Sequence, residues 1–371
     1  MRIALFTPFS PDIGGGSVQL RSHLKEMADL AIAWHYLSGT PVNGECLKWI
    51  GQPLSSGQFV ADLCARSGLP GSKSAVKKIV SQLDADRYWI VAHYEGISVA
   101  DELLSMGRRV HLTVHDEPLG MLIRSRRFRL LWPLMSHTFS RVLRGASSVD
   151  VTSTAMRDYF DRKYGVHCFA LYKYLSELPA VEPRHEPNFL TVGHIGSLYH
   201  PDPFRRFVLA CRSLAAAQGR TLKIVRIGTS PEMDRIAAEE LAIFENHGEM
   251  QEKDAVPLLA ACNFVYAMYP EGMRFKGFRQ TSLPIKLSTY IQAQRPIFAH
   301  TPDDSGLARL ISEFKVGIVC SSKEVSVIQR GVQELLNSQI IRENFEALRI
   351  DLMGPGQIEQ LRSALVSSAS P

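Results

Sequence analysis

The residues Thr281, Ser282, Pro284 and Lys286 form the strongest chemical signal of this sequence. Threonine and serine are common helix N-caps, and proline suits a first helical turn because its missing N–H would have no partner there. A helix beginning here would turn its free N–H groups and the positive end of its dipole toward a ligand, and Lys286 would add a full charge. We therefore predict a phosphate site, although a capped surface helix with an incidental lysine has the same pattern.

A second group of candidates follows an apolar strand in the stretch TVHDEPLG, residues 113–120. His115 and Asp116 would be exposed there at the carboxyl end of a strand, where ligands of α/β proteins bind. Histidine is the side chain best suited to move protons near neutral pH, but a single loop histidine is more often only solvated. His93 and Glu95 also follow a strand, where they could hydrogen-bond the hydroxyl groups of a ligand. An ordinary polar loop explains them at least equally well.

Glycines follow two of the expected strands, at positions where a backbone could approach a ligand closely. Gly15 and Gly16 belong to the loop 8–16 after the first strand, where glycine permits a positive φ or a close approach. Gly196 and Ser197 open the second half of the chain in the same way. The spacing G-x-G-x-x-G is absent from GGGSVQ, which excludes a dinucleotide fingerprint and leaves a structural turn as the alternative.

Length and composition limit the kinds of protein that can position these residues. The chain has 371 residues, of which 45% are hydrophobic, so two domains of about 150–200 residues are expected. No apolar run approaches the roughly 18 residues of a membrane span, and we expect no signal peptide. The six cysteines lie far apart, so reduced thiols and no metal site are expected. A net charge of +5 is too modest to indicate a nucleic-acid partner.

Alternating strands and helices predict two successive α/β domains. In the first, the pattern predicts strands at 2–7, 31–37, 88–93, 109–114 and 148–152, and helices at 17–30, 72–83, 98–106 and 124–144. In the second, strands are expected at 189–196, 222–228, 245–248, 264–269, 296–300 and 317–320, with helices at 203–218, 231–242, 254–261, 284–294, 305–313 and 324–337. Such alternation is typical of a parallel sheet covered by helices on both faces.

The predicted fold class is therefore α/β, with two Rossmann-like doubly wound parallel-sheet domains. We place them at 1–182 and 183–340, joined by a polar, proline-rich linker at 177–188 and followed by a helical tail at 341–371. Two such domains in tandem bind their ligand in the cleft between the carboxyl ends of both sheets.

The segment sxP-x-K-L-x-x-Y-x-x-x-x-R-P-ixa, which contains Lys286, resembles the donor-binding segment of GT-B glycosyltransferases. The likeness is to the retaining family-4 group and its polysaccharide-building relatives. The stretches 113–120, 192–207 and 246–268 are similar to further segments of that family in the same order. The resemblance covers most of the chain and is strongest over 189–320. It implies the GT-B fold, with the tail crossing back onto the N-terminal domain.

The resemblance also implies roles for the candidate residues. Gly196, Ser197, Ser282 and Lys286 would hold the diphosphate of a nucleotide sugar, and His115 would contact the sugar near the reacting carbon. Further contacts to the donor are implied for Gly15, Gly16, Arg205, Gly248, Arg279, Thr281 and Thr289. No metal is needed in this interpretation, because Lys286 and a helix dipole can stabilise the charge of the leaving diphosphate.

Two features depart from the family pattern. Its Glu-x7-Glu pair is replaced by Thr281 and Thr289, so the donor must be held differently and the stereochemical outcome stays open. Asp116 and Glu117 are candidate bases if the anomeric centre inverts. The usual Lys-Gly after the first loop of the second domain is also missing, and we expect the basic loop 271–280 to supply a cation instead.

An arginine-rich amphipathic helix is expected at 124–144, RSRRFRLLWPLMSHTFSRVLR. Phe128, Met135 and Phe139 recur at helical spacing, so this face should pack in the core, with Pro133 disturbing the middle of the helix. The arginines indicate at most a weak contact with an anionic membrane surface.

These observations predict a cytoplasmic glycosyltransferase, at the inner face of the cytoplasmic membrane if the arginines bind there. Its partners would be a nucleotide-diphosphate sugar as co-substrate, with no other cofactor, and a glycan or lipid-linked glycan acceptor in bacterial polysaccharide biosynthesis. The N-terminal domain would bind the acceptor and the C-terminal domain the donor. Two alternatives stay open: a nucleotide-sugar epimerase on the same fold, and a non-catalytic partner subunit of another transferase, which the missing carboxylates favour.

Overall fold

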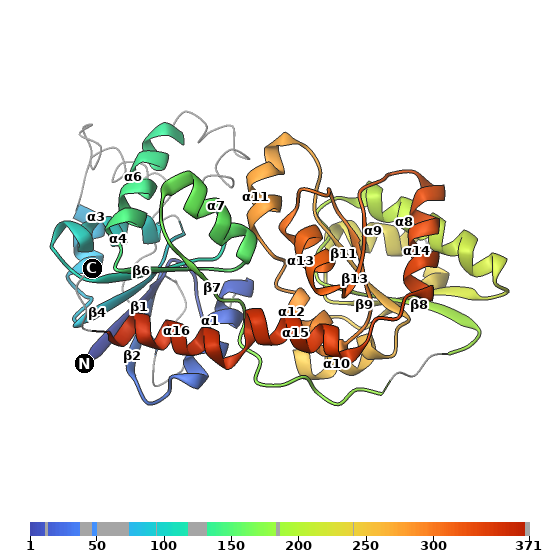
Figure 1. Cartoon of the computed structure of the whole chain (residues 1–371), viewed down its shortest axis with the longest axis horizontal. Helices are drawn as coiled ribbons and strands as arrows, with labels where there is room; N and C mark the ends of the chain where they lie inside the picture. Colours follow the sequence, from blue (N-terminus) through green and yellow to red (C-terminus); the bar gives the residue numbers. More distant parts are fainter. Residues whose placement is uncertain are drawn as a thin grey trace. The chain divides into compact units, whose positions relative to one another are not determined.

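The computed structural model describes residues 1–11, 14–37, 47–49, 74–93, 95–117, 132–182, 186–239 and 241–367. The chain divides into two compact units (Figure 1). Unit 1 contains Met1–Ser176, Arg274–Ser282 and Leu352–Pro371, and unit 2 contains Glu177–Met273 and Leu283–Asp351. Each unit holds one parallel sheet with flanking helices, which confirms the predicted α/β fold class.

The sheet of unit 1 has the strand order β3-β2-β1-β4-β5-β6-β7, and all its pairs are parallel. Its strands are β1 (Arg2–Thr7), β2 (Ala31–Tyr36), β3 (Leu47–Trp49), β4 (Arg87–Val91), β5 (Val110–Val114), β6 (Ser148–Val151) and β7 (Phe169–Ala170). The order reverses between β1 and β4, and ligands of open α/β sheets bind beyond the carboxyl ends of the strands at such a reversal.

Helices cover both faces of this sheet because successive side chains of a strand point to opposite faces. On β1, Ile3 and Leu5 pack with apolar residues of α1 and α16, whereas Ala4 and Phe6 belong to the core under α3, α4, α6 and α7. The helices of unit 1 are α1 (Gly14–Glu26), α3 (Ser74–Val80), α4 (Glu95–Ser105), α6 (Trp132–Gly145), α7 (Thr154–Tyr164), α11 (Lys276–Thr281) and α16 (Pro355–Val366).

The sheet of unit 2 repeats the same topology, with the order β10-β9-β8-β11-β12-β13. Its strands are β8 (Phe189–Ile195), β9 (Thr221–Ile227), β10 (Phe244–Asn246), β11 (Phe264–Met268), β12 (Ile297–His300) and β13 (Gly317–Cys320). Its helices are α8 (Pro201–Ala217), α9 (Pro231–Glu239), α10 (Glu252–Ala260), α12 (Leu287–Ala293), α13 (Gly306–Phe314) and α14 (Val325–Asn337). The reversal lies between β8 and β11.

The C-terminal tail consists of two helices that meet at Gly354. The first, α15 (Arg342–Met353), begins in unit 2 and ends in unit 1, and α16 follows it. Ile358 and Leu361 of α16 are buried in the core of unit 1. Arg362 forms an ion pair with Asp29 after α1, at 2.6 Å. Residues 352–367 are therefore held in unit 1 by both apolar and charged contacts.

The predicted strands are found with small differences in their ends, and three elements differ more. The helix α7 was not expected, although Ser153 caps its first turn and Gly165 ends it in the left-handed conformation. The predicted basic loop 271–280 contains α11 instead. The predicted helix 284–294 starts only at Leu287.

The arginine-rich segment is described only from residue 132, so its arginines before that point lie outside the described residues. Within α6, Met135 and Phe139 are buried in the core of unit 1, as predicted. Pro133 lies in the first turn and does not disturb the helix, which corrects the expectation of a mid-helix proline. Arg141 binds the carboxylate of Asp101 at 2.9 and 3.0 Å.

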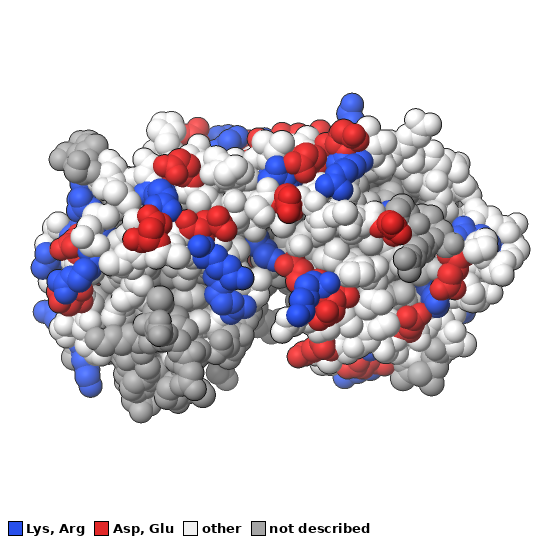
Figure 2. Space-filling model, turned by 90° about the horizontal axis from the view of Figure 1, so that it is seen from below, with Lys and Arg blue, Asp and Glu red and all other residues white. Residues whose placement is uncertain are grey.

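On the face shown in Figure 2, lysines and arginines alternate with aspartates and glutamates. In the parts of the chain that the structure describes, no helix has both the length and the apolar character needed to cross a bilayer.

Candidate active site

Three glycines line the carboxyl edge of the sheet in unit 2. Gly196, Gly228 and Gly248 follow β8, β9 and β10, and their φ angles are 77°, 87° and 66°. The N–H of Gly196 donates to the carbonyl of Ile227 at 2.8 Å, and the N–H of Gly228 donates to the carbonyl of Gly248 at 2.6 Å. The three loops are thus joined by backbone hydrogen bonds, and glycine leaves their surface open to a ligand. The sequence prediction included Gly196 and Gly248 but missed Gly228.

The side chain of Lys286 lies beside Gly196, at the carboxyl edge of the same sheet. Its Nζ donates to the carbonyl of Ser197 at 2.8 Å, and a Cβ on Gly196 would lie 3.9 Å from its Cε. Lys286 is half-buried, and desolvation lowers the pKa of its ammonium group to about 7. The structure therefore brings Lys286 together with Gly196 and Ser197, and their expected role in binding a diphosphate stays a prediction.

Tyr290 holds the end of β8 beside α12. Its buried hydroxyl accepts the N–H of Ile195 at 3.2 Å and donates to the carbonyl of Tyr266 at 2.8 Å. Since Tyr290 comes one helical turn after Lys286, these bonds fix the helix that carries the lysine against the strand that leads to Gly196. The conformation of this cation site is thus set by buried hydrogen bonds.

The local structure before Lys286 differs from the prediction. Lys286 occupies the N-cap position of α12, and no side chain caps this helix. Thr281 and Ser282 are the last residue and the C-cap of α11, so they do not cap α12. Pro284 instead opens a turn in which its carbonyl accepts the N–H of Leu287 at 2.8 Å.

Three predicted donor contacts, Arg279, Thr281 and Ser282, belong to unit 1, whereas Lys286 belongs to unit 2. All three are buried. The hydroxyl of Ser153, at the start of α7, donates to the carbonyl of Thr281 at 2.5 Å. Within the described residues the Oγ of Ser282 is buried without a hydrogen-bond partner. The structure therefore assigns α11 a packing position on α7, and the expected roles of these residues toward a donor stay predictions.

A carboxylate that the sequence prediction missed lies beside Thr289. Glu252, at the start of α10, accepts hydrogen bonds from Ser288 Oγ at 3.1 Å and from Thr289 Oγ1 at 3.0 Å, both through Oε1. Position 289 corresponds to the second glutamate of the Glu-x7-Glu pair in the family that the sequence resembles. A carboxylate does reach this place, but from another helix, and the only sequence signal for it was an acidic first turn of α10.

Arg205 lies in the first turns of α8, with its Nη1 3.8 Å from Asp202 Oδ1 of the same helix. Ser197 is exposed just before that helix. The predicted diphosphate contact of Arg205 is not tested by these positions.

In unit 1, His115 follows β5 and packs on α1. A Cβ on Gly16 would lie 2.7 Å from its Nδ1, and its ring lies 6.1 Å from that of Phe9. Thr152 fixes the main chain by donating to the carbonyl of His115 at 2.9 Å. Gly15 and Gly16 are in the first turn of α1 rather than in a loop, and Gly16 has no positive φ. Gly16 is thus closely approached by the ring of His115, and the expected approach to a ligand stays a prediction.

Burial lowers the pKa of the two imidazole groups that follow β4 and β5. Desolvation lowers the pKa of His115 to about 4, and its Nε2 is buried without a hydrogen-bond partner among the described residues. Desolvation also lowers the pKa of His93, while the charge of Asp116 acts in the opposite direction. The pKa of Glu95, in the first turn of α4, is raised by desolvation. Polar groups with altered proton affinity thus follow β4 and β5.

The carboxylate of Glu117 is bound by two side chains of α7. It is buried, and its Oε1 lies 3.2 Å from Lys163 Nζ and accepts the hydroxyl of Tyr164 at 3.1 Å. These bonds to α7 anchor the loop that begins at His115. Of the two carboxylates considered as bases, Asp116 is the more accessible.

Comparison with known proteins identifies the fold. No protein-family model and no curated protein sequence matches the chain. The solved structure of OtsA is similar over 100% of both chains, with a TM-score of 0.67 and 13% identity. HepE (Alr3699) of Anabaena, in complex with UDP and glucose, is similar over 100% of both chains, with a TM-score of 0.64 and 15% identity. WaaG, a glycosyltransferase involved in lipopolysaccharide biosynthesis, is similar over 99% of this chain and 100% of its own, with a TM-score of 0.63 and 13% identity.

These structures have the two-domain GT-B fold, and the chain therefore has that fold as well. At such identities the likeness establishes the architecture, and the chemistry has to be argued from the residues of this chain.

Proposed function

We propose that the protein is a glycosyltransferase that moves a sugar from a nucleoside-diphosphate sugar to a hydroxyl group of a glycan or lipid-linked glycan. The observation that carries this proposal is the position of Lys286 over Gly196, at the carboxyl edge of a doubly wound sheet. A cation beside exposed backbone is suited to the oxygens of a diphosphate, which point in several directions and carry delocalised charge.

Loss of a diphosphate leaving group is the step that this arrangement would assist. As the bond from the anomeric carbon to the phosphate oxygen breaks, negative charge grows on the diphosphate. Lys286 would stabilise that charge more strongly in the transition state than in the bound donor, which is the requirement for faster turnover. Its hydrogen bond to Ser197 holds the ammonium group in place before the donor arrives.

His115 is proposed to act on the sugar side of the reaction. An imidazole whose pKa is lowered to about 4 is uncharged at neutral pH, so it can donate or accept one hydrogen bond without adding charge. Such a group can orient a sugar hydroxyl near the reacting carbon. Asp116 is the proposed base for the acceptor hydroxyl if the anomeric centre inverts.

The comparisons support specific first choices of substrate. HepE was solved with UDP and glucose, so uridine diphosphate is the first nucleotide to test. WaaG acts in lipopolysaccharide biosynthesis, which supports a bacterial surface glycan, assembled on a lipid in the cytoplasm, as the first class of acceptor.

The test is nucleotide binding by the wild-type chain and by two lysine variants. UDP, GDP, ADP, dTDP and CMP are compared by thermal unfolding, where a ligand at about 100 times its Kd stabilises by about 2.7 kcal/mol. Lys286→Ala should abolish the shift given by the preferred nucleotide and slow transfer by about 2–4 kcal/mol of activation free energy. Lys223→Ala is the matched control, because Lys223 lies near the opposite end of β9 in ion pairs with Glu186 and Glu245. No shift with any nucleotide would refute the proposal.

One observation favours a second candidate, a non-catalytic subunit of another transferase: threonines stand at both positions 281 and 289. That candidate predicts no turnover of a nucleotide sugar with or without acceptor. An epimerase on the same fold would convert the sugar without acceptor. Product analysis of donor incubations with and without an acceptor mixture therefore distinguishes a transferase, an epimerase and a non-catalytic subunit.

A further inference from the structure

A pocket in unit 2 lies at the opposite edge of the sheet from Lys286. It has a volume of about 550 Å³, within the range of about 300–1,000 Å³ that is usual for small-molecule sites. Asn263 directly precedes β11 and Pro296 directly precedes β12, so the pocket opens at the amino ends of these parallel strands. Its lining residues are Val181, Asn263, Gln294, Arg295, Pro296, Leu335, Leu336, Ser338, Ile340 and Arg342.

The polar end of this pocket is positively charged. Arg295 and Arg342 both line it, and no carboxylate is among the lining residues that the structure describes. Arg295 is only 8% exposed, and desolvation lowers the pKa of its guanidinium group. A guanidinium group that lines a pocket forms charge-assisted hydrogen bonds with an anion placed against it. Glu346, one turn after Arg342, is paired with Arg349 at 2.5 Å.

The polar wall is held rigidly by neutral partners. Arg342 donates to Gln294 Oε1 at 3.2 Å and to the carbonyls of Pro179 and Leu178 at 3.2 and 2.9 Å. Gln294 itself has a φ of 52°, a left-handed conformation that is unfavourable for a residue with a side chain, and its Nε2 donates to the carbonyl of Pro179 at 2.6 Å. In the described residues the direct hydrogen-bond partners of Arg342 are neutral, while the nearby carboxylate of Glu346, which interacts with its charge, is itself hydrogen-bonded to Arg349.

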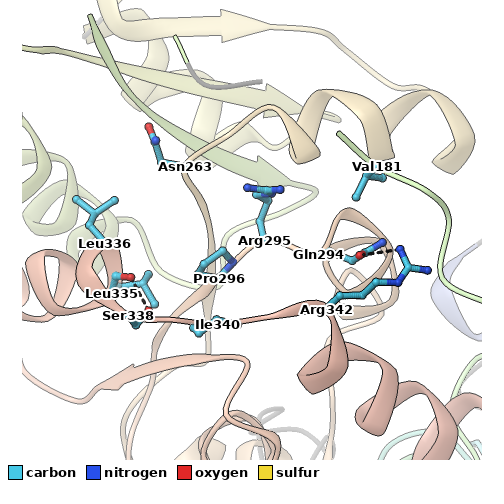
Figure 3. Close-up of a pocket in the computed structure, with 10 residues that line it drawn as sticks. All are labelled: Val181, Asn263, Gln294, Arg295, Pro296, Leu335, Leu336, Ser338, Ile340 and Arg342. Atoms are coloured by element: carbon cyan, nitrogen blue, oxygen red, sulfur yellow. Dashed lines mark hydrogen bonds between the residues drawn. The ribbon is translucent and has the colours of Figure 1, made fainter. Parts of the chain in front are cut away.

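The other end of the pocket is apolar. Leu335 and Leu336 come from the last turn of α14, and Ile340 follows in the connection to α15. Figure 3 shows Arg295 and Pro296 between these leucines on one side and the hydrogen-bonded pair Gln294–Arg342 on the other. A ligand that fits both ends carries an anionic group and an apolar group a few bonds apart.

We propose that this pocket is a binding site for a small amphiphilic anion, a phosphate or carboxylate attached to an apolar group, separate from the site around Lys286. Arg295 and Arg342 bind the anionic group, Gln294 holds the guanidinium group of Arg342 in place, and the leucines of α14 cover the apolar group. The proposal does not depend on the identity of the sugar donor, because no residue of the pocket belongs to the site proposed for the diphosphate.

The test uses hexyl phosphate as the probe in calorimetric titrations of the full chain. We expect one site per chain, with inorganic phosphate and hexanol binding at least about tenfold more weakly, since each lacks one half of the recognised chemistry. Arg342→Met and Arg295→Met should each weaken hexyl phosphate at least about tenfold. Arg309→Met is the matched control, because this half-exposed arginine on α13 is not part of the pocket. Saturating UDP should leave hexyl phosphate binding unchanged.

The outcomes are decisive in both directions. Absence of binding, displacement by UDP, equal affinity for inorganic phosphate, or equal loss with Arg309→Met would each overturn the proposal. If Arg295→Met does not fold, the exposed Arg342 carries the test, since its replacement leaves no buried charge. Vesicles containing phosphatidic acid distinguish the source of the ligand: retention that Arg342→Met removes indicates a lipid, and binding of hexyl phosphate alone indicates a soluble metabolite. UDP binding in the arginine variants shows independently whether the proposed nucleotide site is intact.

Discussion

The ring of His115 fills the space that a side chain on residue 16 would need, because a Cβ on Gly16 would lie 2.7 Å from Nδ1 and 2.9 Å from Cε1 of that ring. The helical conformation of α1 does not itself require glycine at this position, since Gly16 has no positive φ. The requirement comes from the close approach of the helix to the imidazole. Glycine at residue 16 and histidine at residue 115 are therefore parts of one local arrangement.

Replacing Gly16 by alanine should displace His115 rather than unfold unit 1. The methyl group would force the ring away, and a misplaced contact near a reacting atom lowers turnover by up to about 100-fold. UDP binding should be unchanged, because Lys286 and Gly196 are in unit 2. The measurement is the transfer rate and the UDP affinity of the same preparation.

Gly356→Ala is the control for this change. Gly356 lies in α16, and beyond the neighbouring backbone no atom of the described residues stands within 4 Å of a Cβ at that position. Alanine should there be neutral or stabilise the helix by up to about 1 kcal/mol, with normal transfer. Wild-type activity of Gly16→Ala would mean that the position of His115 does not matter for the reaction.

The buried imidazole of His115 should make the chain less stable in mild acid. Its pKa is about 4 in the folded chain, mainly through desolvation, and about 6.5 when unfolded. Between these values the unfolded chain binds a proton that the folded chain does not, so stability falls as the pH drops from 7 to 5, by up to about 2 kcal/mol for this group. Urea unfolding at both pH values should show a smaller loss for His115→Asn. An equal loss in both proteins would show that His115 is solvated.

The strands and the fold class were predictable because each buried parallel strand is a short apolar run between turn residues, as in IALF of β1 or FVYAM of β11. The helix α7 was not predicted, although Ser153 as N-cap and Gly165 after its last turn are both typical of helix ends. Other features could not be read locally. The start of α12 at Leu287 overrides the usual preference of Pro284 for a first helical turn, and Glu252 reaches Thr289 only through the packing of α10 on α12.

The affinity for UDP should fall as the pH rises above 7. Desolvation lowers the pKa of Lys286 to about 7, and a bound diphosphate would raise it by favouring the charged ammonium. Below pH 7 the free chain already carries this proton. Above pH 7 binding requires uptake of a proton, so the affinity decreases by up to about tenfold per pH unit. Titrations between pH 7.5 and 9 in buffers of different ionisation enthalpy measure both the affinity and the proton uptake. Lys286→Arg, which stays charged, should bind UDP with little dependence on pH, and a flat wild-type profile would contradict the lowered pKa.

Glu252 should contribute to binding of the nucleoside part of the donor rather than the diphosphate. Its Oε1 accepts hydrogen bonds from Ser288 and Thr289, directly after Lys286 and Leu287 in the chain, so a carboxylate is held close to the proposed diphosphate site. Hydroxyl groups of a ribose would donate to this carboxylate more strongly than to an amide of the same shape. Glu252→Gln should therefore weaken UDP by about tenfold and leave the affinity for inorganic pyrophosphate unchanged. Asp254→Asn removes an exposed charge from the same turn of α10 and should change neither affinity. If pyrophosphate and UDP weaken equally in Glu252→Gln, the carboxylate acts on the position of Lys286 and not on the ribose.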